Sequence, residues 1–435
     1  MKDLLFVNAS QVVTCAGPAR ARRGAEMREA GILRNTAVAV SEGRIAMIGA
    51  ASDLQNAYSD AEVVDCRGGV LTPGLVDSHT HAVFGKPRFE EHELRAAGQD
   101  YMEIARGGGG IHASVRDFRE RSEDDLYELA ATRVRELASY GTTTLEIKSG
   151  YGLSVDDELK ALRVIGRLAE RQPVRIVATW LGAHEIPREF RSSDDRRRDF
   201  NELLTRDMLP KVVQQGIARF ADVFCEPGVF TLDETRRILD ASRASGLGLK
   251  LHADELESSG GAELAASLNA ASADHLAAIS DSGIDALARS STVATLLPGT
   301  MLFLGKSRQA PARALIDRGA AVALASDFNP GTSPTVNFPL MLTLGVSQLH
   351  MSVAEALVAV TVNGAAAVSL AGETGQIAPG FAADLALFSI SDVRELPYWY
   401  GARLCVGTWR AGAPCHPYEN LGNLNARLPE VVPAG

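Results

Sequence analysis

Apolar strand segments alternate with helical segments through the middle of the chain, and this alternation restricts the possible folds most strongly. In one unit, Ser122 and Asp125 predict a helix start, apolar residues keep helical spacing, and Gly141 ends the helix before a buried strand. The expected strands are 70–81, 142–148, 174–184, 218–226, 248–255, 272–278, 292–298 and 320–329. Strands and helices in this order predict an α/β protein with a (β/α)8 TIM barrel.

Both ends of the chain have a different texture, with short strands separated by turns. A chain of 435 residues exceeds the size of one core, because single cores stop growing at roughly 250–300 residues. We therefore expect a small β-sandwich domain built from residues 1–69 and 371–435. The barrel, residues 70–370, would be inserted between its two parts.

Composition excludes several classes of protein. A net charge of -10 argues against binding to nucleic acid, which requires clustered Lys and Arg. The five cysteines form no CxxC pair, so neither a disulfide framework nor a thiolate zinc site is indicated. No apolar run is long enough to span a membrane, and the first residues do not fit a signal peptide. We expect a cytoplasmic protein that does not bind membranes.

Polar residues stand where several predicted strands end. Barrel strands all end at the same face, so their terminal side chains converge there. Histidines end the first, third, fifth and sixth strands, and an aspartate ends the eighth; these residues are His79, His81, His184, His252, His275 and Asp327.

The motif His79-Thr80-His81 suits a metal site, because side chains two residues apart on a strand project to the same side. Imidazole and carboxylate are ligands for zinc, iron and related metals, and an open coordination position leaves room for a reactive water. The motif alone also fits a pair of buried, hydrogen-bonded histidines. His252 and Asp327 at other strand ends favour the metal site.

Several stretches resemble the amidohydrolase superfamily of metal-dependent hydrolases, and the resemblance covers nearly the whole chain. They are "TPGLVDSHTH", "KLHADE", "SDFNPGT" and "GQIAPGFAADLALF". Four more are together similar to its imidazolonepropionase family, the ring-opening enzymes of histidine degradation: "FGKPRFEEH", "EIKSGYGL", "TWLGAHEIP" and "ASDFNPGTSP". The function implied is hydrolysis of a small anionic cyclic amide, 4-imidazolone-5-propanoate, to N-formimidoyl-L-glutamate, in an enzyme expected to be a homodimer.

The resemblance also implies roles for individual residues. It implies one divalent or trivalent metal ion per chain, zinc or iron, held by His79, His81, His252 and Asp327. The implied catalytic residues are Asp327, Glu255, His275 and His184. The implied substrate contacts are Arg88, Tyr101, Tyr151, His184, Glu255, Asn329, Gly331 and Thr332. Many superfamily members bridge two metals with a carboxylated lysine, but Lys148 belongs to a one-metal pattern and is not assigned as a ligand.

Simpler roles are open for four of these residues. Arg88 could pair with a neighbouring glutamate on the surface, and Tyr151, between two glycines, could be a turn residue packed on the barrel rim. Glu255 could stand at the start of a helix, and His275 could be a core histidine.

Two other functions compete with the one implied. One is another amidohydrolase, such as a cyclic-amidine or aminopurine deaminase, against which Arg88 and "EIKSGYGL" favour a small anionic substrate. The other is a non-catalytic scaffold with the same fold, which would have no need of all four ligand types.

Overall fold

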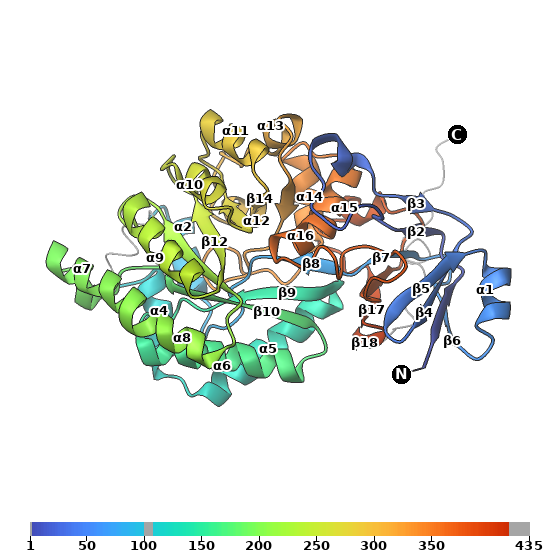
Figure 1. Ribbon diagram of the computed structural model, residues 1–435, viewed down its shortest axis with the longest axis horizontal. Helices are drawn as coiled ribbons and strands as arrows, with labels where there is room; N and C mark the ends of the chain where they lie inside the picture. Colours follow the sequence, from blue (N-terminus) through green and yellow to red (C-terminus); the bar gives the residue numbers. More distant parts are fainter. Residues whose placement is uncertain (1, 100–107, 417–435) are drawn as a thin grey trace.

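The structure, a computed structural model, describes residues 2–99 and 108–416 and contains a barrel of parallel strands (Figure 1). Each barrel strand pairs in parallel with the next along the chain. The strands are β8 (Leu75–Asp77), β9 (Thr142–Lys148), β10 (Arg175–Ala183), β11 (Phe220–Cys225), β12 (Gly248–Ala253), β13 (Ser272–His275), β14 (Val293–Leu296) and β15 (Val322–Leu324). The predicted (β/α)8 barrel is confirmed.

The barrel closes between β8 and β15, just beyond the regular ends of both strands. Thr80 and Phe328 form a parallel bridge there. The His81 N–H donates to the Phe328 carbonyl at 2.9 Å, and the Asp327 N–H donates to the His79 carbonyl at 3.1 Å. Main-chain hydrogen bonds therefore join the segment with the two neighbouring histidines to the segment with the aspartate.

Helices surround the barrel (Figure 1). The expected helix start is confirmed in α5, where the Asp125 N–H donates to Ser122 Oγ at 3.1 Å. The helices of this layer are α2 (Phe89–Ala96), α4 (Ile111–Glu120), α5 (Glu123–Ser139), α6 (Val155–Arg171), α7 (Asp194–Glu202), α8 (Leu209–Gln215), α9 (Leu232–Ala244), α10 (Gly261–Ser267), α11 (Asp281–Arg289), α12 (Pro298–Phe303), α13 (Ala312–Asp317), α14 (Leu340–Ser347), α15 (Val353–Ala359) and α16 (Val362–Ala367). Within the described ranges, no helix is both long and apolar enough to cross a membrane.

Two further sheets lie beside the barrel and share one hydrophobic core (Figure 1). The first has the order β5-β4-β1-β6 and contains β1 (Leu4–Val7), β4 (Ala37–Ser41), β5 (Arg44–Gly49) and β6 (Glu62–Asp65). The second has the order β18-β17-β16-β7-β2-β3 and contains β2 (Gln11–Val13), β3 (Ile32–Leu33), β7 (Val70–Pro73), β16 (Leu385–Phe388), β17 (Cys405–Arg410) and β18 (Ala413–His416). Phe6 of the first sheet packs edge-on against Trp409 of the second, with ring centroids 4.9 Å apart. Both ends of the chain thus build the small domain.

One expected strand is divided. We expected residues 70–81 to enter the barrel as one strand, but β7 belongs to the small domain and only β8 to the barrel. Gly74 lies between them, and its N–H donates to the Asp384 carbonyl at 2.8 Å. A Cβ atom at Gly74 would lie 2.1 Å from Thr143 Oγ1, so the backbone passes too close to β9 for any side chain. The domain limits at 69/70 and 370/371 remain predictions.

We expect Gly74→Ala to destabilise the protein, because the new methyl group must displace the buried Thr143 side chain. Such overpacking costs about 1–3 kcal/mol. Urea unfolding checks this, with Gly49→Ala as the control, since a Cβ at Gly49 would meet no atom within 4 Å. Equal unfolding midpoints for the two variants would contradict the proposed tight contact.

Candidate active site

His79 and His81 follow β8 and face the same side of the backbone, as their spacing predicts. Their ring centroids are 5.3 Å apart, and Thr80 between them turns away and donates from Oγ1 to the Glu146 carbonyl at 2.6 Å. Asp327 Oδ1 lies 3.6 Å from His79 Nε2 and 3.5 Å from His81 Nε2. The closing seam of the barrel therefore presents two imidazoles and one carboxylate to a single point.

Three more histidines from other strands complete the cluster. His252 lies 4.5 Å from His79 between ring centroids, and His275 lies 5.1 Å from His252. His184 stacks on His81 at 5.0 Å. Potential ligand atoms lie within 4.8 Å of one another in three overlapping sets, which are His79–His252–His275, His81–His184–His252 and His79–His81–Asp327. The structure thus brings together all six polar strand-end residues of the sequence prediction.

Burial keeps four of these imidazoles neutral, those of His79, His81, His184 and His275. Burial, followed by nearby positive groups, lowers the pKa values of His79, His81 and His275 well below the usual range. Burial also lowers the pKa of His184 to about 3. A neutral imidazole is the form that binds a metal ion.

The donor atoms of the cluster fit a metal ion. His79 Nε2 and His252 Nε2 are buried and have no hydrogen-bond partner among the described residues. Buried polar atoms without partners are costly, and a cation at their meeting point would satisfy them. The cluster offers imidazole nitrogens and a carboxylate oxygen. These are the ligand types that zinc, iron and related metals accept.

Carboxylates stand behind two of the histidines, and the sequence prediction missed them. Asp274 Oδ2 lies 2.6 Å from His79 Nδ1, and Asp222 Oδ2 lies 3.0 Å from His252 Nδ1. Such contacts orient a histidine so that its other nitrogen faces the metal. The available signal was an aspartate within each of two strands of the barrel, β11 and β13.

Lys148 lies beneath the cluster and is fully buried. Its Nζ is 2.7 Å from both Glu146 Oε1 and Asp222 Oδ2, and 3.7 Å from Asp274 Oδ2. Burial alone would lower the pKa of Lys148, but Asp222, Glu146 and Asp274 raise it above its usual value. Lys148 is therefore a charged ammonium group paired with carboxylates.

Glu255 follows β12 and faces His275, whose Nδ1 lies 3.5 Å from Glu255 Oε2. The interpretation of Glu255 as a helix-start residue is wrong, because helix α10 begins only at Gly261. The Glu226 carboxylate holds the turn instead, accepting hydrogen bonds from the N–H groups of Glu255 and Leu256. Burial, Asp327 and Glu226 raise the pKa of Glu255 well above its usual range.

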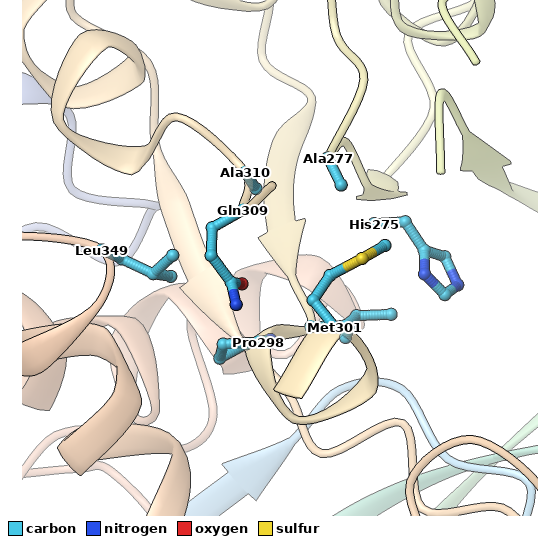
Figure 2. Close-up of a pocket in the computed structure, with 8 residues that line it drawn as sticks. His275, Ala277, Pro298, Met301, Gln309, Ala310 and Leu349 are labelled. Atoms are coloured by element: carbon cyan, nitrogen blue, oxygen red, sulfur yellow. The ribbon is translucent and has the colours of Figure 1, made fainter. Parts of the chain in front are cut away.

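A small cavity lies next to His275 (Figure 2). Figure 2 shows the His275 ring at the edge of the lining residues and directed away from Leu349 and Gln309. Most of the lining is apolar, from Ala277, Leu297, Pro298, Met301, Ala310 and Leu349. Because this lining is mostly apolar, the cavity suits packing around His275 and not the binding of an anion.

Arg88 packs against the loop that follows Asp327. The main-chain N–H of Arg88 donates to the Pro330 carbonyl at 3.1 Å. The guanidinium lies against Gly331, where a Cβ atom would be 1.3 Å from Arg88 Nη2. Only 9% of the Arg88 side chain is exposed, so it is not a surface charge. Nε and Nη1 have no hydrogen-bond partner among the described residues, and the Glu91 carboxylate stays 3.7 Å from Nε.

The loop at 329–332 is held in one shape by Asn329. Its Oδ1 accepts hydrogen bonds from the N–H groups of Gly331 and Thr332, both at 2.8 Å. Tyr151 is buried, with its ring centroid 5.6 Å from His184 and 6.0 Å from His81, so it belongs to the site and not to the outer rim. Tyr101 lies outside the described residues.

The barrel and its histidine-rich cluster are those of the amidohydrolase type, and comparison with known proteins agrees. A model of the amidohydrolase family matches residues 70–404. In shape, the chain is similar to an adenosine deaminase from Xanthomonas campestris, with a TM-score of 0.68, 19% identity and coverage of 95% of this chain and 92% of that one. It is also similar to a triazine hydrolase variant, with a TM-score of 0.70, 16% identity and coverage of 95% and 94%. At these identities only the fold is shared.

Relatives of much higher identity are imidazolonepropionases. The protein of Geobacillus sp. (strain WCH70) is 47% identical over 92% of this chain and 95% of its own length. The protein of Solibacter usitatus (strain Ellin6076) is 43% identical over 95% of this chain and 98% of its own. The chain belongs to the imidazolonepropionase family of amidohydrolases and is a hydrolase.

We expect the purified protein to hold about one metal ion per chain, because its buried donor atoms need a cation. His79→Ala should reduce the metal content to below about a tenth, since ligand loss leaves too few donors. Elemental analysis by mass spectrometry checks this, with the exposed His92→Ala as the control. Full metal content in His79→Ala would show that this cluster is not the binding site.

Proposed function

We propose that the enzyme hydrolyses 4-imidazolone-5-propanoate to N-formimidoyl-L-glutamate, a step of histidine degradation. One observation supports this most directly: the buried Arg88 guanidinium, which has no hydrogen-bond partner at Nε or Nη1 in the part of the chain that the structure describes, lies beside the loop that follows Asp327. A guanidinium binds a carboxylate with two parallel hydrogen bonds, so Arg88 suits the propionate tail. The high-identity relatives carry the name of this activity.

We assign His79, His81, His252 and Asp327 as the residues that would hold one zinc or iron ion. When bound, such an ion is a Lewis acid that lowers the pKa of a water to about 7 and so supplies a nucleophile at neutral pH. Water adds to the ring carbonyl, the amide C–N bond breaks, and the released nitrogen takes up a proton. Side chains of the enzyme must therefore accept one proton from the water and deliver one to the released nitrogen.

Two carboxyl groups with different environments suit these two tasks. Burial, the largest influence, raises the pKa of Asp327 to about 6, so most of this group is ionised at pH 7 and can accept a proton from water. A nearby cation would favour the ionised form further. The pKa of Glu255 is raised well above its usual range, so it can hold a proton for the leaving nitrogen. His275, 3.5 Å from Glu255, can exchange protons with it.

The neutral His184 ring presents an acceptor to the site and does not donate to a developing oxyanion. Its Nδ1 lies 2.9 Å from the Gly150 carbonyl, which can only accept, so the proton of a neutral ring sits on Nδ1. Nε2 then carries a lone pair, and donation from Nε2 requires the protonated ring. We propose that His184 and Tyr151 contact the ring of the substrate, with Asn329, Gly331 and Thr332 shaping the tail side.

Assays of ring opening test the proposed function. Loss of imidazolonepropionate absorbance should require metal, stop when a chelator removes the metal, and return when the metal is restored. Release of ammonia from an aminopurine or a cyclic amidine, with no loss of imidazolonepropionate, would favour a deaminase. No turnover of any of these by the metal-loaded protein would favour the scaffold. A cytoplasmic location and a homodimeric state remain predictions.

We expect Arg88→Ala to weaken binding of the tailed substrate, because a desolvated charge pair is lost. Loss of one partner costs about 2–4 kcal/mol, which raises KM roughly 30- to 900-fold. Steady-state kinetics check this, with exposed Arg135→Ala as the control and a 4-imidazolone without the tail as a second substrate. An unchanged KM, or an equal change for both substrates, would contradict the role of Arg88.

We expect Asp327→Asn to lose most turnover even where metal is retained, because an amide cannot accept the proton from water. General base catalysis contributes about 10²–10⁴-fold, so kcat should fall by that factor. Kinetics normalised to measured metal content check this, with exposed Asp281→Asn as the control. A rate near that of the unaltered enzyme would exclude the proton role.

A further inference from the structure

One ammonium group lies between the two carboxylates that stand behind metal-site histidines. Lys148 Nζ is 2.7 Å from Asp222, which approaches His252, and 3.7 Å from Asp274, which approaches His79. All of these side chains are nearly or completely buried. The third partner of Lys148 is Glu146, whose carboxylate accepts a hydrogen bond from Lys148 Nζ at 2.7 Å. The same carboxylate accepts from the main-chain N–H of Thr80, the residue between His79 and His81, at 3.3 Å.

We propose that Lys148 is a positioning residue for the metal centre, which fixes the orientations of His79 and His252 through Asp274 and Asp222, and the tautomer of His79 through Asp274. The inference rests on the metal-binding role proposed above. It does not make Lys148 a ligand or a catalytic residue.

The Asp274 carboxylate only accepts hydrogen bonds, so its contact of 2.6 Å with Nδ1 of a neutral His79 ring places the proton on Nδ1. Nε2 of His79 then has a free lone pair, as a metal ligand requires. Asp222 lies within ion-pair distance of His252 Nδ1, at 3.0 Å, and so restricts the orientation of that ring. A buried carboxylate keeps one orientation when an ammonium group is paired with it. Lys148 is within ion-pair distance of both aspartates.

Lys250 provides a matched comparison. It is equally buried and also lies 3.7 Å from Asp274 Oδ2. Its hydrogen bonds, however, go to the main-chain carbonyls of Ser78 and Ala367, at 3.1 and 3.3 Å. Lys250 therefore supports the backbone of the barrel and makes no contact with Asp222 among the described residues.

The test measures metal affinity, which does not depend on turnover. Lys148→Met removes the ammonium group but keeps an unbranched chain. We expect its metal dissociation constant to rise about 10- to 100-fold, the usual effect of losing support behind a ligand. Competition with a chelator of known affinity gives this constant. Once reloaded with metal, the variant should show a lower kcat with KM changed less than about threefold, since the tail contact at Arg88 is intact.

Lys250→Met is the control and should change metal affinity less than about threefold. Equal weakening in both variants would overturn the proposal, because loss of any buried cation would then suffice. Unchanged affinity in Lys148→Met would overturn it as well. Absence of metal from the unaltered protein would instead refute the proposed function, and the two failures are therefore distinguishable.

A measurement on the unaltered chain covers the case in which Lys148→Met does not fold. Nitrogen-15 NMR of labelled histidines in metal-free protein should show His79 with the proton on Nδ1. Loss of the signal in His79→Gln assigns it. A proton on Nε2 of His79 would overturn the proposal.

Discussion

Closure of the barrel between its first and last strands is the constraint on which the rest of the site depends. The hydrogen bonds at this seam join the main chain of His79 and His81 to that of Asp327 and Phe328. Three of the four proposed ligands therefore lie on two segments whose spacing is set by backbone pairing and not by flexible side chains. A barrel that failed to close would have an intact sequence motif and no metal site.

Burial of charge is the second organising feature. Carboxylates and ammonium groups occupy the lower part of the barrel interior, where single charges are costly and only paired ones are tolerated. The imidazoles of His79 and His81 are neutral, because burial and nearby cations both disfavour a further positive charge. Burial raises the pKa values of both Asp327 and Glu255. The two groups differ in their neighbours, although they lie in one site.

Much of this arrangement could be predicted from the sequence, because it depends on local periodicity and on where strands end. The eight strands and the convergence of His79, His81, His252 and Asp327 are of this kind. The break at Gly74 could not be predicted, since it depends on contact with Thr143 on another strand. The supporting aspartates were missed because their partners lie on distant strands, so only tertiary structure reveals them. The helix-start alternative for Glu255 could be dismissed only with the structure, because the turn is held by Glu226 on a neighbouring strand end.

The pairing of β7 with β16 joins segments at opposite ends of the chain, with the whole barrel between them (Figure 1). During synthesis, all eight barrel strands leave the ribosome before β16 does. One side of β7 must therefore stay unpaired throughout that time, although β2 is already available for its other side. Because β8 follows β7 after one glycine, the segment just before His79 and His81 gains its last neighbouring strand only when the last part of the small domain arrives.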